Sequence, residues 1–369
     1  MLRKTLGILV IILYSLVFFV SLEQGPLKSL QSFILGLVGL VVILLIASNI
    51  AMKIRLFDIS DEPRKQHKGK IPLVGGIGLF FSITYGGFVF GVNEFYIYIL
   101  YSLIPIMIAG LLDSFQGINI KPVYRIIAQI ISSWIIILSS DVYVKDLGDI
   151  LGIGSLYLGQ LGIPFTIFAV VGICNAFNMV DGKDGLLGSI TVIVMSFVML
   201  LLYLNGIIYL WGQIVIFSVL VYLAFNLNLF GRKRKIFLGD HGSTALGHIM
   251  AWSLIDLSQT AQIITPVSAL WFVLLPLTDA LMTFVRRFKS SSSIFVADRQ
   301  HFHHRLSDNN CSDLQILIIF SVITFLSSTI AVISNIFLID EYIMFYSYIT
   351  LIIFLALLGF MRPARTTKG

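Results

Sequence analysis

The chain has 369 residues, of which 57% are hydrophobic and only 12% are charged. A soluble domain has about 45–50% apolar and about 25% charged residues, so this composition excludes an ordinary soluble protein. The formal net charge is +6, but no motif for nucleic-acid recognition accompanies it. Cys174 and Cys311 are the only cysteines. We predict that both are free thiols, because two cysteines do not make a disulfide framework.

The apolar residues gather in long runs that are nearly free of charge, and a helix needs about 20 such residues to cross a bilayer. These runs predict an all-α, polytopic membrane protein of about 12 transmembrane helices, with about 11 as the alternative count. A membrane β-barrel is not expected, because its strands read as weakly alternating segments. The runs are 6–22, 32–52, 73–91, 95–112, 123–140, 162–178, 186–204, 208–228, 243–258, 265–285, 313–335 and 342–360.

We predict a single membrane domain over 1–369, with the motifs described below in 55–306 and the last two helices within 313–360. The run at 6–22 is interpreted as an additional, retained N-terminal helix. The alternative is a secretory signal, but no small-x-small cleavage site follows the run.

The basic residues indicate how the chain crosses the membrane, because Lys and Arg are enriched in cytoplasmic segments. With the N-terminus inside and the runs alternating, every basic residue except Lys28 and Lys145 falls in an inside segment. This asymmetry predicts a multi-pass membrane protein with both termini in the cytoplasm.

The first two cytoplasmic loops contain cations and one carboxylate. Residues 61–76, DEPRKQHKGKIPLVGG, carry a basic cluster before two glycines, which allow close backbone approach. They are interpreted as an anion-binding loop or, alternatively, as a positive stop signal. Asp113 ends an apolar helix in LLDSFQGINIKPVYR. A carboxylate at that depth indicates a functional site, and a solvated helix end is the alternative.

The third loop, NAFNMVDGKDGLLGS at 175–189, repeats a polar residue every three positions. Residues at i and i+3 share a helix face. The polar residues are Asn175, Asn178, Asp181 and Asp184. The interleaved glycines predict a broken helix whose backbone also faces a site.

The fourth loop, GRKRKIFLGDHGSTALG at 231–247, has four basic residues before Phe237 and places Asp240 between glycines. A Gly-rich turn at a helix N-terminus is suited to anions. A carboxylate there can hold Mg²⁺, which takes one or two carboxylates plus substrate phosphates. A simple helix cap by Asp240 or Ser243 is the alternative.

The fifth loop ends in DRQHFHHRL, with His301, His303 and His304. Zinc is the alternative for a histidine cluster, but the spacing of Cys and carboxylates does not support a closed zinc site. Donor His and Arg side chains against phosphate oxygens fit better. Asp279 lies about two turns inside the preceding apolar run, where a carboxylate needs a partner or a pathway, and a structural hydrogen bond is the alternative.

Carboxylates for a metal and cations for phosphates, all on one membrane face, suit Mg²⁺-dependent phosphoryl transfer, which depends on positioning and charge neutralisation. A cytosolic, phosphorylated donor and a lipid acceptor follow from the location of the loops. The residues alone lead no further than this.

The strings IPLVGG, NAFNMVDGKDGL, FLGDHGS and DRQHFHH together resemble the polyprenyl-phosphate N-acetylhexosamine-1-phosphate transferases, over residues 55–306. The His-x-His-His form is more similar to the WecA-like branch than to the muramoyl-pentapeptide branch. The resemblance implies transfer of a HexNAc-1-phosphate, with GlcNAc expected, from a UDP-sugar to undecaprenyl phosphate with release of UMP. The product would begin a cell-surface polysaccharide.

The resemblance also implies roles for single residues. Asp113 and Asp240 are expected to be catalytic. Mg²⁺, or Mn²⁺ in its place, is expected on Asp240 and Asp181. The UDP-N-acetylhexosamine is expected to contact Lys68, Asn178, Asp181, Asp184, Phe237, Arg299, His301, His303 and His304. Among these, Phe237 would stack on uracil.

One position departs from the family pattern. The family usually has two adjacent aspartates where this chain has Asp113 followed by Ser114. Any role that needs paired carboxylates is therefore in question, and we expect Asp113 alone to orient or deprotonate the lipid phosphate. UDP-FucNAc and UDP-QuiNAc are alternative donors.

Two other function classes compete with the transferase. A transporter of an anionic solute would fit the many helices, but its site would be expected near the midplane within repeats. An inactive scaffold is considered because of Ser114. The sequence leaves the oligomeric state open, with a homodimer as one alternative to a monomer.

Overall fold

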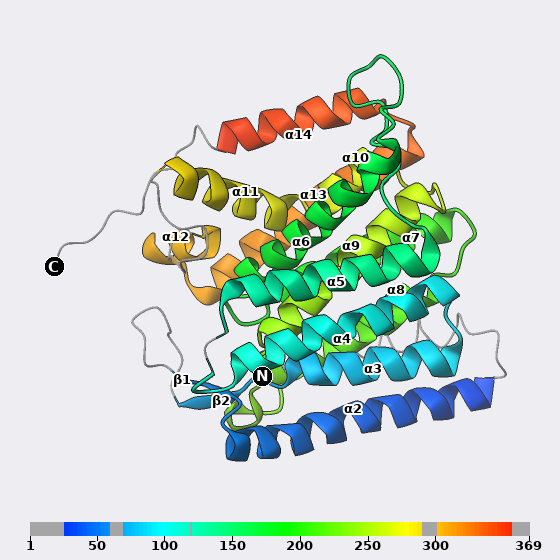
Figure 1. Cartoon of the computed structure of the whole chain (residues 1–369). Helices are drawn as coiled ribbons and strands as arrows, with labels where there is room; N and C mark the ends of the chain where they lie inside the picture. Colours follow the sequence, from blue (N-terminus) through cyan, green and yellow to red (C-terminus); the bar gives the residue numbers. More distant parts are fainter. Residues whose placement is uncertain (1–25, 60–68, 119, 290–300, 356–369) are drawn as a thin grey trace. The chain divides into compact units, whose positions relative to one another are not determined.

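The computed structural model describes residues 26–59, 69–118, 120–289 and 301–355. Figure 1 shows a helical protein with one two-stranded sheet among these residues. The run predicted at 6–22 lies outside the described residues. The α-helices are α2 (Pro26–Ile54), α3 (Gly75–Phe90), α4 (Glu94–Ser114), α5 (Pro122–Ser140), α6 (Gly162–Val180), α7 (Leu186–Leu204), α8 (Leu210–Asn226), α9 (Asp240–Gln259), α10 (Pro266–Phe272), α11 (Leu274–Lys289), α12 (Phe302–Asp308), α13 (Asp313–Ile336) and α14 (Glu341–Leu355).

The helices support a polytopic membrane protein. In the part of the chain that the structure describes, six helices are long and apolar enough to cross a bilayer, or seven if the bent pair α10–α11 counts as one span. Large apolar side chains stay exposed along α2, as on a helix that faces lipid rather than water. They include Ile34, Leu35, Val38, Val42, Ile46 and Ile50. The expected total of about 12 transmembrane helices stays a prediction.

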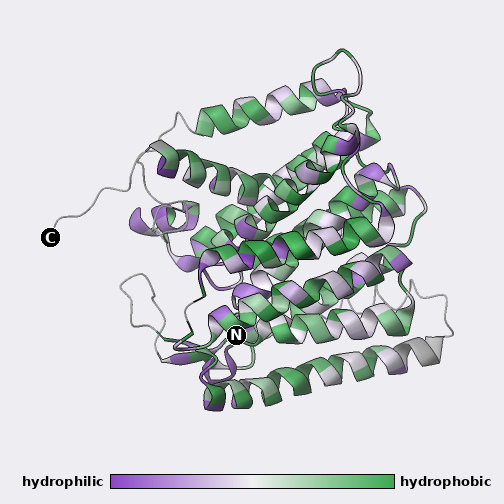
Figure 2. Ribbon diagram, viewed as in Figure 1, coloured by the Kyte–Doolittle hydropathy of each residue, from purple (hydrophilic) through white to green (hydrophobic). Residues whose placement is uncertain are grey.

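Hydropathy is divided between the helices and a few short segments. Figure 2 shows that most helices are hydrophobic, whereas hydrophilic residues gather on α12 and around the strands β1 (Phe57–Ile59) and β2 (Lys70–Pro72). The strands pair antiparallel, with Phe57 opposite Pro72. Among the described residues, the ends of the first and fifth predicted loops are thus hydrophilic.

The apolar run at 265–285, expected to be one helix, is broken. α10 ends at Phe272 and α11 begins at Leu274, with a bend of 82° between them. Pro276 explains the break: its ring would clash with the carbonyl four residues earlier, and it is tolerated in the first turn of the new helix. The prediction of a continuous helix there was wrong.

The chain divides into two compact units, 1–140 with 195–246, and 141–194 with 247–369. In the first unit, α3 contacts α2, α4 and α8, and α4 packs along α5. In the second, α11 packs against α6 and α13, and α10 against α13 and α14. Each unit is described by itself below.

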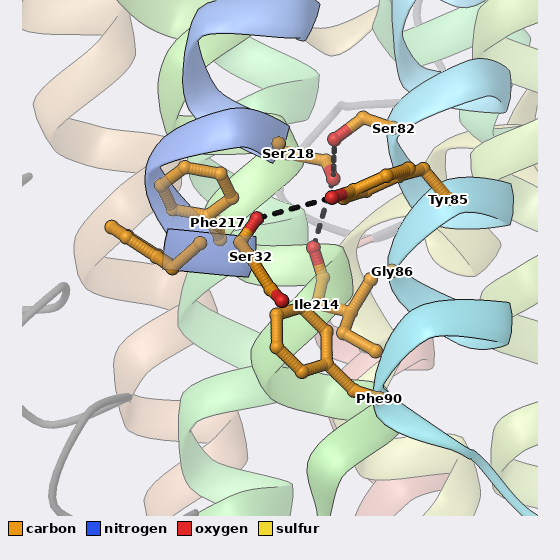
Figure 3. A pocket seen from close by; sticks show the side chains of 10 residues that line it. Ser32, Ser82, Tyr85, Gly86, Phe90, Ile214, Phe217 and Ser218 are labelled. Carbon is orange, nitrogen blue, oxygen red and sulfur yellow. Dashed lines mark hydrogen bonds between the residues drawn. The ribbon is translucent and has the colours of Figure 1, made fainter. Parts of the chain in front are cut away.

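Small residues bring α2 close to α3 and α8. Gly36 of α2 lies against the ring of Tyr85, and Gly86 of α3 lies against Ile214. Figure 3 shows the small cavity between these helices, where Ser82 and Ser218 share a hydrogen bond of 2.7 Å. This is the small-residue, hydroxyl-bridged packing that membrane helices use where no water drives association.

Candidate active site

The first unit joins two of the sequence motifs through their main chains. The amide of Phe237 donates to Pro72 O at 2.9 Å. In return, the amides of Gly75 and Gly76 donate to Phe237 O and Leu238 O at 2.9 and 3.0 Å. The IPLVGG and FLGDHGS strings are therefore one structural element, and α3 begins directly beside the start of α9.

Close approach explains the glycines of that element. A Cβ atom on Gly76 would lie 2.5 Å from the Cα of Gly242 and 2.5 Å from a ring carbon of His241. A Cβ atom on Gly75 would lie 2.9 Å from Phe237 O. Only glycine lets these backbones meet without a shift.

Three helices bring two carboxylates to one guanidinium. Asp113 ends α4, Arg125 lies in the first turn of α5, and Asp240 begins α9. Arg125 Nη1 lies 3.0 Å from Asp113 Oδ2 and also forms an ion pair with Asp240 Oδ2. The two residues expected to be catalytic therefore lie together, with all three side chains partly exposed.

The sequence did not lead us to predict a role for Arg125 in the site. It was considered only as one of the basic residues that indicate the orientation of the chain in the membrane. The KPVYR string places it at a helix start directly after the loop that carries Asp113. A cation so close to a buried-looking carboxylate is the signal that could have identified it.

A second layer lies behind the carboxylates. His241 follows Asp240 and is fully buried, and its Nδ1 lies 3.5 Å from Ser114 Oγ. Ser114 Oγ also donates to Gly110 O at 2.7 Å. Ser114 thus faces the residue that follows Asp240, the second carboxylate expected to be catalytic.

Phe237 is half-buried, and the ammonium of Lys235 lies 5.1 Å from the centre of its ring. A cation over an aromatic face is a favourable contact. The ring is held by the main-chain bonds described above. Its stacking on uracil stays a prediction.

The second unit contains the polar string of the third loop. α6 ends at Val180 and α7 begins at Leu186, so Asp181 and Asp184 lie in the turn between two helices while Asn178 lies in the last turn of α6. The predicted break of the helix is confirmed, and the expectation that its backbone faces a site stays a prediction. Beside it, Lys183 Nζ forms an ion pair of 2.7 Å with Asp313.

The histidine cluster of the fifth loop is anchored by Asp279. One carboxylate oxygen lies 3.0 Å from His301 Nδ1, and the other accepts from the amide of Phe302 at 2.8 Å. His301 and His303 are buried, with rings stacked 6.0 Å apart, and the ring of His304 lies 4.2 Å from that of His303. The intramembrane carboxylate therefore has a partner, and that partner belongs to the predicted site.

His303 also meets the third loop. A Cβ atom on Gly182 would overlap the imidazole of His303, so these two motifs lie in contact within the unit. Burial lowers the pKa of His303 well below its usual value, and His304, His301 and Lys183 add to the effect. His303 is therefore neutral near pH 7.

Some predictions stay untested. Lys68 and Arg299 lie outside the described residues. Asp181 and Asp240 belong to different units, so their sharing of one Mg²⁺ stays a prediction. Within the described ranges no group of three or more His, Cys, Asp or Glu could hold a metal, and both Cys174 and Cys311 are free thiols, as predicted.

The carboxylates of the first unit fit Mg²⁺ better than zinc. Mg²⁺ usually takes one or two carboxylates and completes its shell with waters and substrate phosphates. Asp113 and Asp240 supply two partly exposed carboxylates at one place. The donor set therefore suits a metal that arrives together with a phosphate substrate.

Comparison with known proteins points to one family. Residues 96–258 match the model described as glycosyl transferase family 4. The chain is 34% identical over 300 residues to the undecaprenyl-phosphate alpha-N-acetylglucosaminyl 1-phosphate transferase of Escherichia coli K12, with 79% of this chain and 80% of that protein covered. It is 32% identical over 303 residues to the enzyme of the same name from Haemophilus influenzae, with 79% and 83% covered.

Proposed function

The chain belongs to the polyprenyl-phosphate N-acetylhexosamine-1-phosphate transferase family, and on this premise we propose that it transfers GlcNAc-1-phosphate from UDP-GlcNAc to undecaprenyl phosphate. The relatives carry that activity in their names, and the match spans four fifths of their length. The observation that carries the proposal is the meeting of Asp113, Arg125 and Asp240 in one unit.

The reaction is a phosphoryl transfer between two phosphates. An oxygen of the lipid phosphate forms a bond to the β-phosphorus of the UDP-sugar. The bond from that phosphorus to the bridging oxygen breaks, and the oxygen leaves with the electron pair as part of UMP. The product is a lipid-pyrophosphate-linked sugar. Such a reaction needs in-line positioning and neutralisation of phosphate charge more than covalent help.

The residues of the first unit divide these tasks. Asp113 orients the lipid phosphate or takes its proton, since it lies at the C-terminal end of the apolar helix α4. Arg125 offers N–H donors that suit phosphate oxygens. Asp240 would hold Mg²⁺, with Asp113 beside it. When bound, the ion neutralises phosphate charge and stabilises the leaving oxygen.

The second unit supplies groups suited to the nucleotide sugar. Asp279 fixes the position of His301, the ring of His303 stacks on that of His301, and the ring of His304 lies tilted beside His303. Neutral or cationic imidazoles donate to phosphate oxygens. Together with Asn178 and the turn at 181–185, they form the proposed donor-binding half of the enzyme.

We also propose the cellular setting. The asymmetric distribution of Lys and Arg supports a cytoplasmic position for the motif loops, where UDP-sugars are found, with both termini on the same side. The membrane would be the bacterial plasma (inner) membrane, because undecaprenyl phosphate, the proposed acceptor of the reaction, is a lipid of that membrane. The lipid-linked product would begin a cell-surface polysaccharide.

The test uses the full chain purified in lipid nanodiscs with undecaprenyl phosphate and Mg²⁺. UMP release and a GlcNAc-bearing lipid pyrophosphate are expected with UDP-GlcNAc, and neither is expected from Asp113→Asn. Parallel reactions with UDP-FucNAc and UDP-QuiNAc test the donor. Exclusive use of another aminosugar would change the substrate assignment. Uptake of an anionic solute into vesicles without UMP release would favour the transporter.

A further inference from the structure

His241 lies in a cradle made by glycines from three segments. A Cβ atom on Gly76 of α3 would lie 2.5 Å from ring carbon Cδ2, and one on Gly239 would lie 2.5 Å from ring carbon Cε1. A Cβ atom on Gly110 of α4 would lie 2.5 Å from the Cα of His241. The imidazole therefore fills a space that only glycine neighbours leave open.

The hydrogen bonds of Ser114 indicate which group donates at its contact with this ring. The hydroxyl donates its single hydrogen to Gly110 O at 2.7 Å, so toward His241 it can only accept. Its partner at 3.5 Å is His241 Nδ1, so at this contact the imidazole is the donor. Nε2 is buried and has no hydrogen-bond partner among the described residues.

This arrangement does not suit a residue that only fills space. A buried nitrogen without a partner is unfavourable, and a leucine would fill the cradle without that cost. Nor can His241 touch a substrate, because its side chain is fully buried. The ring therefore acts through its neighbours.

Ser114 and His241 each stand next in sequence to one of the two carboxylates that are proposed to be catalytic. Ser114 directly follows Asp113 at the end of α4, and His241 directly follows Asp240 at the start of α9. A contact between Ser114 and His241 therefore joins the two helix ends immediately beside the ion pairs of Arg125. If it is lost, the two carboxylates are no longer held at one guanidinium.

We propose that Ser114 and His241 form a positioning pair, which holds Asp113 and Asp240 together in place of a second adjacent aspartate. The inference rests on the proposed function and deepens it. Arg125 opposes two carboxylates here, and a third would add negative charge where phosphates must bind. A hydroxyl hydrogen-bonded to an imidazole supplies the alignment without that negative charge.

The test is a double-mutant cycle on the full-length enzyme in nanodiscs. Ser114→Ala and His241→Ala should each lower kcat by about tenfold, because displacement of a reacting group is costly in rate. KM for UDP-GlcNAc should change little. The double variant should be no slower than the slower single variant, because both changes break one contact. Losses that multiply to about a hundredfold would overturn the pair.

Two further variants separate hydrogen bonding from packing. His241→Asn keeps an N–H donor near the position of Nδ1 and should regain most of the lost kcat. His241→Leu keeps the volume and should stay as slow as His241→Ala. Wild-type kcat in the leucine variant would overturn the proposal. Ser218→Ala, which removes a buried serine hydrogen bond elsewhere in the same unit, is the matched control and should keep wild-type kcat.

Failure of the inference and failure of the proposed function give different results. A wild-type enzyme that releases no UMP from UDP-GlcNAc refutes the function. The contact between Ser114 and His241 is then tested by thermal unfolding of the wild-type protein, the two single variants and the double variant. A smaller decrease in Tm for the double variant than the sum of the single decreases supports the pair, and additive decreases refute it.

Discussion

Replacement of Arg125 tests how the first unit tolerates two neighbouring carboxylates. Arg125→Ala removes an ion pair of 3.0 Å to Asp113 and a second one to Asp240. All three side chains are partly exposed, so each ion pair is discounted for solvent to about 1 kcal/mol. The two uncovered carboxylates then repel each other. We expect the free energy of unfolding to decrease by about 2 kcal/mol, which corresponds to a decrease in Tm of about 4–8 °C.

The same change should affect activity far more than stability. Removing one preorganised charged donor from a transfer site typically lowers kcat by about 100-fold to 1,000-fold. Arg125→Lys should be intermediate, because an ammonium cannot bridge two carboxylates as a guanidinium does. The assays are UMP release in nanodiscs and thermal unfolding followed by fluorescence.

Two controls make the Arg125 result interpretable. Lys121→Ala removes an exposed cation just before the same helix and should leave both Tm and kcat unchanged. Adding Asp113→Asn to Arg125→Ala should recover part of the lost Tm, since one of the repelling charges is gone, but no activity. If Arg125→Ala behaved like Lys121→Ala in both assays, the ion-paired site described above would be refuted.

Three further changes probe other parts of the two units. Gly76→Ala should cost about 1–3 kcal/mol by overpacking and abolish most activity. Asp279→Asn should weaken the hydrogen bond to His301 and lower kcat/KM for UDP-GlcNAc by about 10-fold to 100-fold. Because the pKa of His303 is lowered by burial, the unfolded chain takes up a proton below pH ~6.5 that the folded chain does not. Tm should therefore decrease as the pH falls from 7 to 5, and His303→Gln should reduce that decrease.

The changes at Gly76 and Asp279 each have a matched control. Gly39→Ala places a methyl group where nothing lies within 4 Å, and it should be tolerated. Asp308→Asn changes an exposed carboxylate of α12 and should leave kcat/KM unchanged. Equal effects of Gly76→Ala and Gly39→Ala would contradict the close backbone approach. An unchanged pH dependence in the variant of His303 would contradict its neutral, buried state.

The sequence predicted the elements better than their contacts. Charge-free runs gave helices at nearly all the expected places, because a bilayer imposes length and apolarity on each span. The break at Pro276 could have been read from the sequence, since proline interrupts the hydrogen bonding of the turn before it. The pairing of the IPLVGG and FLGDHGS strings could not, because main-chain hydrogen bonds over a long separation leave no residue pattern.

The site was predicted by residue type rather than by partner. Asp113 and Asp240 were expected because carboxylates beside apolar helices are costly without a role. Arg125 and His241 were not, since a cation near a membrane also reports topology and a lone histidine after an aspartate carries no periodic signal. Asp279 was singled out, but its contact with His301 depends on how a helix and a loop fold back on each other.

The break between α10 and α11 has a consequence for how the chain is made. The seven residues of α10 are too few to cross a bilayer alone. Its partners follow later in the chain: Trp271 donates to Met344 O at 3.2 Å, and the amide of Thr265 donates to Asn335 at 3.0 Å. During synthesis α10 can therefore complete these contacts only after α13 and α14 have been translated. A chain truncated before α13 would keep all the sequence motifs but would lack the helices against which α10 packs. Assembly of the second unit therefore depends on the C-terminal helices.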